Sequence, residues 1–358
     1  MGDGLNLAQG LTLARVATRN ILGFPSPLVV ESSWRGVLKQ AFPDLVAGRL
    51  LRGSQGERAL YAFFEVSLPT GVREVFLKYR PPFNFTERHQ KRFLNEIFYL
   101  RYLAPQIDVL HPRLLGFQVD SASLKAHLLT ESLRGTCESW QDLSEAEQLR
   151  QFPRVIEQIA SFHAQWAVHP HHKRHASFPW SFPKTLEQVN QRLSRERHVS
   201  KLSGPVIALF RYLQDPSHLE PLYRRLEHIT LCHGDLHFGQ LMFSKQSSDI
   251  FLLDYEHSAV APVGFDLAHF LGLRLSLFER RQMETELLEL YRKSLWENGW
   301  PIATQDILSE YQVGLVHNFV VLWSRYQREP RKLFRQLLER VAVAILDHSV
   351  VPLSAVSA

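Results

Sequence analysis

The spacing of apolar residues changes twice along the chain, and the changes separate three regions. Residues 1–47 carry apolar positions at helical spacing, which predicts a helical extension of one or two helices. Residues 48–134 read mainly as short alternating strands with one helix between them, over residues 86–103. Residues 135–350 show long stretches of helical periodicity, such as residues 149–168. An antiparallel sheet domain followed by a mostly helical domain is therefore predicted.

The strand predicted over residues 72–79 carries a lysine at a buried position. Lys78 lies on one face of this strand, and an ammonium group buried without an anionic partner is costly. The helix over residues 86–103 supplies the candidates, with Glu96 next to its apolar face and Glu87 as the alternative. A solvent-exposed lysine and a solvent-exposed glutamate are the alternative, which the sequence favours less.

The first hairpin of the strand region, over residues 48–66, is predicted to turn at residues 52–57. The residues Gly53, Ser54 and Gly56 lie in this turn, where backbone N–H groups are able to bind phosphate oxygens. A plain hairpin turn without a ligand explains the same pattern.

Composition excludes several classes of protein. An apolar content of 45% and a charged content of 22% are ordinary for a globular chain of 358 residues. The 41 basic and 36 acidic residues leave a net charge of +5, which a bound nucleotide would explain and which is too diffuse to indicate nucleic-acid binding. Basic side chains cluster late in the chain and are most simply a solvated helix face: Arg325, Arg328, Arg331, Lys332 and Arg335.

Two cysteines, no signal-peptide pattern and no apolar run of membrane-spanning length indicate a cytoplasmic protein without a membrane span.

The most informative stretch runs from residue 231 to residue 270. It contains His233-Gly234-Asp235, then Gln240, and a second acid, Asp254, at the end of an apolar run. Two short strands around a polar turn would bring Asp235, Gln240 and Asp254 to one mouth. Phosphoryl transfer needs such a set, because a carboxylate accepts the hydroxyl proton of the substrate and further oxygens hold Mg²⁺. A polar turn capped by aspartates is the alternative.

This stretch resembles the aminoglycoside phosphotransferase and choline kinase family of small-molecule kinases. The family motif H-G-D-x-x-x-x-N is matched by residues 233–240, with Gln240 in place of the final Asn. Maltokinases of the same superfamily also carry a Gln at this position. The resemblance implies that Asp235 is the catalytic base and that Gln240 and Asp254 bind the metal. Two histidines are further candidates: His233 would brace the loop, and His237 would contact phosphate or acceptor.

The resemblance also assigns supporting residues. Asp266, in Gly264-Phe265-Asp266, would brace the catalytic loop, and Lys78 held by Glu96 would position the nucleotide phosphates. Backbone groups near Glu131 and Leu133 would bind the adenine ring, and Gly53, Ser54 and Gly56 remain the candidates for the phosphate loop.

The implied fold is α+β and protein-kinase-like, with a five-stranded N-lobe over residues 48–134 and a helical C-lobe over residues 135–350. The implied reaction is transfer of the γ-phosphoryl group of ATP, with Mg²⁺, to a hydroxyl of a small molecule. Amino alcohols, sugars, aminoglycosides and natural-product intermediates all suit this fold, and GTP is an alternative donor. A nucleotide-binding pseudokinase is the alternative function, because Gln240 departs from the motif.

Overall fold

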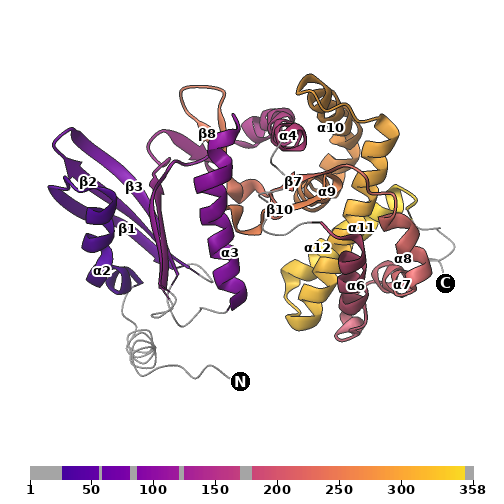
Figure 1. The fold of residues 1–358 in the computed structure, drawn as a ribbon. Coiled ribbons are helices and arrows are strands. Elements are labelled where there is room, and N and C mark those ends of the chain that lie inside the picture. Colours follow the sequence, from indigo (N-terminus) through magenta and orange to yellow (C-terminus); the bar gives the residue numbers. More distant parts are fainter. Residues whose placement is uncertain (1–25, 56–58, 81–86, 121–124, 170–179, 351–358) are drawn as a thin grey trace. The chain divides into compact units, whose positions relative to one another are not determined.

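The chain forms two compact units. The computed structural model describes residues 26–55, 59–80, 87–120, 125–169 and 180–350 (Figure 1). One unit comprises Met1–Glu138 together with Met242–Glu256, and the other comprises Ser139–Leu241 together with His257–Ala358. We call them the sheet unit and the helical unit. The predicted boundary at residue 134 lies close to the first of these divisions and stays a prediction.

An antiparallel sheet of five strands forms the centre of the sheet unit. Its spatial order is β1-β2-β3-β5-β4. The strand bounds are Ala47–Gln55 (β1), Leu60–Leu68 (β2), Gly71–Arg80 (β3), Leu114–Asp120 (β4) and Lys125–Glu131 (β5). The predicted five-stranded antiparallel sheet is confirmed.

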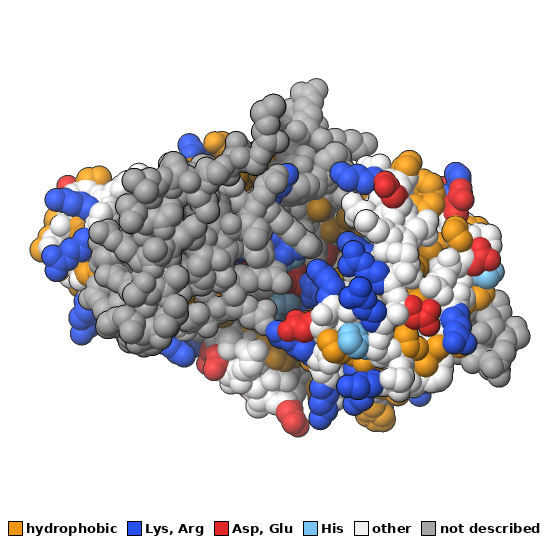
Figure 2. All heavy atoms as spheres, turned by 90° about the horizontal axis from the view of Figure 1, so that it is seen from below, with side chains coloured by type: hydrophobic (Ala, Val, Ile, Leu, Met, Phe, Trp, Pro, Cys, Tyr) orange, Lys and Arg blue, Asp and Glu red, His pale blue; other side chains and the backbone are white. Residues whose placement is uncertain are grey.

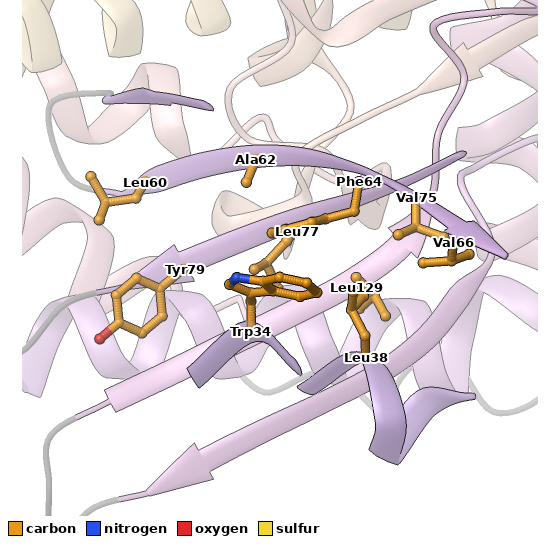
Figure 3. Close-up of a cluster of buried hydrophobic side chains, with 10 residues drawn as sticks. All are labelled: Trp34, Leu38, Leu60, Ala62, Phe64, Val66, Val75, Leu77, Tyr79 and Leu129. Atoms are coloured by element: carbon orange, nitrogen blue, oxygen red, sulfur yellow. The ribbon is translucent and has the colours of Figure 1, made fainter. Parts of the chain in front are cut away.

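Helices cover both faces of this sheet. Trp34 and Leu38 of α2 (Ser26–Ala41) pack among Leu77 and Tyr79 of β3 and their neighbours (Figure 3). Side chains of a strand alternate between faces, so Lys78 points to the other side, where it meets α3 (Glu87–Phe98). A π-helical turn, Tyr99–Leu103, and a short 3-10 turn, Ala104–Gln106, continue α3.

The first hairpin differs from its prediction. Strand β1 continues through Gln55, and Gly53 and Ser54 pair with Ala62 and Tyr61 of β2 instead of forming a turn. The predicted turn at residues 52–57 is therefore wrong at its start, because small polar residues also satisfy their backbone groups in a strand ladder. Gly56 lies outside the described residues.

Three short strands complete the sheet unit. They are β6 (Cys137–Ser139), β8 (Leu241–Ser244) and β9 (Ile250–Leu252), in the order β6-β8-β9. The apolar run that was predicted to end on Asp254 is β9, whose Ile250 and Leu252 are buried. Asp254 follows it, and a 3-10 turn begins at Tyr255.

The helical unit consists of long helices and one small ribbon (Figure 1). The ribbon is formed by β7 (Ile229–Cys232) and β10 (Ala259–Pro262), which pair antiparallel. The helices are α4 (Glu145–Val168), α6 (Phe182–Leu193), α7 (Gly204–Leu213), α8 (Pro216–Tyr223), α9 (Gly264–Arg274), α10 (Leu277–Glu297), α11 (Thr304–Arg328) and α12 (Lys332–Asp347). Short 3-10 turns lie at Trp140–Asp142, Val199–Lys201, Phe238–Gln240 and Tyr255–His257. None of the helices in the described ranges is both long and apolar enough to span a bilayer.

Local signals explain where these helices begin. Ser144 and Glu147 form a capping box at the start of α4, and Ser276 and Glu279 form another at the start of α10. The predicted mostly helical second domain is confirmed.

Two glycines allow α9 and α11 to pack closely. A Cβ atom added to Gly264 would lie 1.8 Å from the Glu310 carbonyl oxygen, and one added to Gly314 would lie 2.0 Å from the Gly264 carbonyl oxygen. The helices therefore meet backbone to backbone at this point. The contact matters for the site, because Asp266 lies in the first turn of α9.

Replacing Gly264 with Ala is expected to lower the free energy of unfolding by about 3 kcal/mol, because the added methyl group collides with a backbone carbonyl that has no room to move. Urea unfolding of the two proteins measures the difference. Gly204→Ala is the matched control, since a Cβ atom there would meet nothing within 4 Å. A Gly264→Ala protein with the urea midpoint of the wild type would show that the helices separate at little cost.

Candidate active site

In the sheet unit, a buried lysine is surrounded by three carboxylates. Lys78 Nζ lies 2.7 Å from Glu96 Oε2, 2.9 Å from Asp254 Oδ1 and 3.0 Å from Glu256 Oε1. Lys78, Glu96 and Glu256 are buried, whereas the Asp254 side chain is 34% exposed. The structure thus brings together Lys78, Glu96 and Asp254, which the sequence assigned to nucleotide and metal binding. The acid that pairs with Lys78 on α3 is Glu96, the first of the two candidates.

Helix α3 positions the segment Asp254-Tyr255-Glu256 as well as the lysine. Asn95 donates hydrogen bonds from Nδ2 to the backbone carbonyls of Tyr255 and Glu256, at 3.3 and 3.4 Å. One turn later, the Tyr99 ring stacks on the Tyr255 ring with centroids 3.7 Å apart. Asp254 itself has a left-handed backbone with φ of 62°, which is uncommon for a residue with a side chain and is typical of functional sites. Its carboxylate is thereby held on Lys78.

Sequence reasoning assigned no role to Glu256, and it considered Arg80 only as a competitor of Lys78 at the end of the predicted strand. Arg80 is almost fully buried, and its Nη2 donates a hydrogen bond of 2.5 Å to Glu256 Oε1. The available signal was the alternation of β3, which puts Lys78 and Arg80 on the same face. Burial raises the pKa of Glu256, but Lys78 and Arg80 lower it by more, so Glu256 is an ionised carboxylate that bridges two cations.

Protonation in this cluster is uneven. Burial would lower the pKa of Lys78, but Glu96, Asp254 and Glu256 raise it well above its usual value, so the ammonium group keeps its charge. Glu96 is the opposite case. Burial raises the pKa of Glu96 to about 8. The Lys78 charge opposes this shift, and the nearby Asp254 and Glu256 carboxylates add to it.

Glu96→Gln is expected to remove a pH dependence of stability. The folded-state pKa of Glu96, about 8, is above its ordinary value of 4.5, so the folded protein binds the proton more tightly than the unfolded chain. The stability from this group is complete below about pH 4.5 and is lost as the pH rises through 8. Between about pH 6 and about pH 9, the free energy of unfolding measured with urea should therefore fall more in wild type than in Glu96→Gln. Glu65→Gln, whose side chain is 36% exposed and pairs with Arg49, serves as the control.

A difference between wild type and Glu96→Gln that is the same at both pH values would contradict the raised pKa.

The remaining nucleotide candidates also lie in the sheet unit. Glu131 ends β5, and its backbone N–H donates to the Arg113 carbonyl. The Leu133 carbonyl accepts hydrogen bonds from the N–H groups of Thr136 and Cys137, at 3.2 and 2.8 Å. The Leu133 carbonyl therefore already accepts two hydrogen bonds from the backbone. Adenine binding at this segment stays a prediction.

The helical unit contains the loop His233-Gly234-Asp235, which directly follows β7. Asp266 of α9 holds this loop: its Oδ2 accepts from the His233 N–H at 2.5 Å and its Oδ1 from the Gly234 N–H at 2.8 Å. His163 of α4 lies 3.3 Å from Asp266 through Nε2 and 2.7 Å from the Tyr291 hydroxyl through Nδ1. Burial raises the pKa of Asp266, but His163 and the loop lower it by more. The structure places Asp266 where a loop-bracing residue is expected.

Gly234 is required by the conformation of this loop. Its φ is +80°, and a Cβ atom there would lie 2.2 Å from the His257 carbonyl oxygen. A residue with a side chain would displace the next residue, which is Asp235.

Asp235 lies near several histidine side chains and an arginine. Its Oδ1 is 3.5 Å from Nε2 of His269, and its side chain is 25% exposed. Burial raises the pKa of Asp235, but His269, His257, His237 and Arg325 together lower it by more. The carboxylate is therefore ionised at neutral pH and is accessible enough to meet a substrate.

His269, which sequence reasoning missed, is a neutral neighbour of this carboxylate. Burial lowers its pKa to about 4. Asn318 donates from Nδ2 to the Gly314 carbonyl at 2.9 Å, so its Oδ1 accepts the proton on Nδ1 of His269 at 3.0 Å. Nε2 then carries a lone pair, and it accepts a hydrogen bond from Nη2 of Arg274 at 3.0 Å. The contact of His269 with Asp235 is therefore not an ion pair.

Gln240 and His237 lie together on the turn after the loop. His237 Nδ1 accepts a hydrogen bond from the Gly239 N–H at 3.0 Å, so a neutral ring carries its proton on Nε2. That nitrogen lies 3.3 Å from the side-chain amide nitrogen of Gln240. The amide oxygen of Gln240 is an acceptor of the kind that a hard cation prefers.

The donor set of the predicted metal site suits Mg²⁺. Asp254 offers a carboxylate and Gln240 an amide oxygen, and hard oxygen ligands are the ones that Mg²⁺ prefers. Gln240 belongs to the helical unit and Asp254 to the sheet unit, so that the two bind one ion stays a prediction.

Comparison with known proteins gives consistent results. The profile of the Phosphotransferase enzyme family matches residues 63–302. A methylthioribose kinase of Escherichia coli O45:K1 (strain S88) is 30% identical over 105 residues, which cover 29% of this chain and 20% of the kinase. A probable choline kinase 2 of Arabidopsis thaliana is 40% identical over 50 residues, 14% of each chain. The alignments thus span at most about a fifth of the length of these relatives.

A solved structure shows the same fold over most of the chain. The GDP complex of wild-type aminoglycoside 2'-phosphotransferase-IIIa superposes with a TM-score of 0.58 at 13% identity, covering 87% of this chain and 98% of that one. The predicted protein-kinase-like fold is thereby confirmed.

Proposed function

Because the chain belongs to the Phosphotransferase enzyme family, we propose that it transfers the γ-phosphoryl group of ATP to a hydroxyl group of a small molecule. The family prediction and the enzyme class, a small-molecule phosphotransferase, are confirmed at the level of the family. The nucleotide, the metal ion and the acceptor belong to the proposal. It is carried by one observation above all, the ionised and partly exposed Asp235 on a loop that Asp266 holds in place.

Asp235 is proposed to orient the acceptor hydroxyl and take its proton. The hydroxyl oxygen forms a bond to the γ-phosphorus, the bond from that phosphorus to the bridging oxygen breaks, and ADP leaves with the electron pair. The hydroxyl proton passes to the Asp235 carboxylate. A carboxylate whose pKa is below its usual value is a weak base, so most of its effect would come from orienting the hydroxyl.

The Lys78 cluster is proposed to bind the nucleotide phosphates. A buried ammonium group with a raised pKa keeps its charge at neutral pH and suits the α- and β-phosphates. Glu96 holds Lys78 in place at 2.7 Å. Mg²⁺ would be held by Asp254 and Gln240 and would neutralise phosphate charge when bound. His237 would orient the Gln240 amide, which is a reason for a longer Gln side chain to be effective in place of Asn.

The test is transfer of label. Purified protein is incubated with Mg²⁺, γ-labelled ATP or GTP and separate alcohols that include choline, methylthioribose, sugars and an aminoglycoside. Labelled product from one class of alcohol, formed by wild type and not by Asp235→Asn, is the expected result. Nucleotide that binds tightly without transfer to any alcohol would favour the pseudokinase, and a protein that binds no nucleotide would contradict the proposal.

A further inference from the structure

A cavity opens in the helical unit between the end of α9 and one side of α12. Its volume is about 710 Å³, which is the size of a small-molecule site. Leu273, Leu333 and Leu337 form its apolar walls. Its polar lining is mainly basic, with Lys201, Arg274, Arg335 and Arg340. In Figure 2, Lys and Arg side chains gather on the face of this unit where α12 lies.

The positive charge of this cavity is not neutralised by neighbouring acids. Among the residues that the structure describes, none of the four cations forms an ion pair within 4.0 Å. Glu339 is the one acid in the described lining, and its carboxylate accepts hydrogen bonds from the backbone N–H and the hydroxyl of Ser203. Arg340 donates through Nη1 to the Leu273 carbonyl at 2.8 Å, which fixes its guanidinium at the wall.

Arg274 connects the cavity with the catalytic loop. Its Nη2 donates to His269 Nε2 at 3.0 Å, and that nitrogen lies 3.5 Å from Asp235 Oδ1. The guanidinium is therefore within two hydrogen-bond lengths of the proposed base. Its Nε is buried and has no hydrogen-bond partner in the described part of the chain. Burial lowers the pKa of Arg274, Asp235 opposes the shift, and Arg325 and Arg340 add to it, which reflects how close these groups lie.

The positive charge of the cavity would favour acceptors that carry a negative charge. Four cations with apolar walls between them would repel a choline or an aminoglycoside and would bind a phosphate or carboxylate group through charge-assisted hydrogen bonds. Most of the basic cluster is exposed, as the sequence predicted for a solvated helix face, and its exposed Arg335 also lines the cavity. Arg325 is the exception, because it is half-buried near Asp235.

We propose that the phosphate acceptor is an anionic alcohol, whose phosphate or carboxylate group binds to Arg335, Arg340 and Arg274 while its hydroxyl reaches Asp235. This inference rests on the proposed kinase function and specifies its substrate class. His269 Nε2 contacts both Arg274 Nη2 and Asp235 Oδ1, so the hydroxyl and the anionic group of such a molecule would lie a few bonds apart.

Two matched series of acceptors test the charge of the substrate. The first is glycerol, glycerol 3-phosphate, glycerate and 3-amino-1,2-propanediol, and the second is glucose, glucose 6-phosphate, gluconate and glucosamine. Within each series the number of carbon atoms is constant and the charge of the molecule changes. We expect kcat/KM for an anionic member to exceed that of its neutral and cationic partners by about ten-fold or more. The phosphate and carboxylate members show which oxyanion is bound.

Three variants test where the anion binds. Arg335→Gln and Arg340→Gln are each expected to raise KM for the anionic acceptor about ten-fold and to leave kcat/KM for neutral acceptors within about two-fold. Lys332→Gln, on the same helix but outside the cavity lining, is the matched control and should change neither. Melting temperatures of all three show whether they are folded.

The outcomes separate this inference from the kinase function. Transfer only to neutral or cationic alcohols would overturn the inference and leave the kinase standing. Equal effects of Lys332→Gln and Arg340→Gln would overturn it as well. If none of the alcohols is phosphorylated, inorganic phosphate serves as the probe. Millimolar phosphate, compared with chloride of equal ionic strength, should raise Tm more in wild type than in the Arg335→Gln/Arg340→Gln double variant, and an equal rise would overturn the inference.

Discussion

Asp235→Asn is expected to lower kcat about a thousand-fold while nucleotide affinity stays within about two-fold of wild type. The amide has the shape of the carboxylate and keeps its place beside His269, but it does not accept the hydroxyl proton. The carboxylate is 25% exposed and lies in the helical unit, whereas the Lys78 cluster lies in the sheet unit. Initial rates of label transfer and equilibrium titration with nucleotide measure the two quantities.

The same substitution has a useful control at an exposed acid. Asp249→Asn changes an exposed side chain whose carboxylate accepts a local hydrogen bond from the Ser247 hydroxyl, and it should leave kcat unchanged. Melting temperatures of both variants should stay within a few degrees of wild type, because neither loses a buried ion pair. A kcat for Asp235→Asn within ten-fold of wild type, in a folded protein, would show that another group handles the proton.

The order of elements was accessible from the sequence because it depends on local periodicity. Alternation along β3 separates Val75 and Leu77 from Lys78, and it is the reason that α2 covers one face while Glu96 of α3 meets the other. The helix predicted over residues 149–168 followed from its apolar spacing, and α4 ends at Val168 as expected.

Pairing between distant residues was less accessible. Arg80 and Glu256 are 176 residues apart, and nothing in the local pattern of either shows that they meet. The chain from Asn318 through His269 to Arg274 joins α11 and α9 and depends on their close packing at Gly264 and Gly314. Periodicity predicts which face of a helix is buried but not which neighbour it meets, so His269 and the basic cavity became visible only in the structure.

The two sets of cations have different surroundings, and this difference has a chemical meaning. Lys78 and Arg80 are matched by three carboxylates, so the sheet unit neutralises its own charge before any ligand binds. The cations of the cavity form no ion pair among the described residues, and the one acid of the lining, Glu339, is bonded to Ser203. A nucleotide that binds Lys78 would compete with the carboxylates that already surround this lysine. An anion that binds in the cavity would meet arginines that are not yet paired with a carboxylate of the described residues.

Lys78→Met should have the largest effect on stability. The substitution removes the cation that lies within 3.0 Å of Glu96, Asp254 and Glu256, and leaves three acids whose oxygens lie within 4.8 Å of one another. Breaking a buried ion pair by removing one partner costs about 3–5 kcal/mol, because a buried charge is left uncompensated. We expect a loss of that size in urea unfolding at about pH 9, where Glu96 of the wild type is ionised, and a smaller loss at about pH 6, where Glu96 holds its proton.

Lys78→Met should also weaken nucleotide binding, and a second substitution separates this effect from the loss of stability. Lys78→Met/Glu96→Gln removes one acid together with the lysine and is expected to recover part of the stability, since fewer carboxylates then repel one another. It should not recover nucleotide affinity, which we expect to be reduced about a hundred-fold in both variants, because the ammonium group for the phosphates is missing. Lys39→Met, at an exposed position of α2, is the control for loss of one positive charge. If the double variant binds nucleotide as wild type does, Lys78 stabilises the sheet unit and has no part in holding the phosphates.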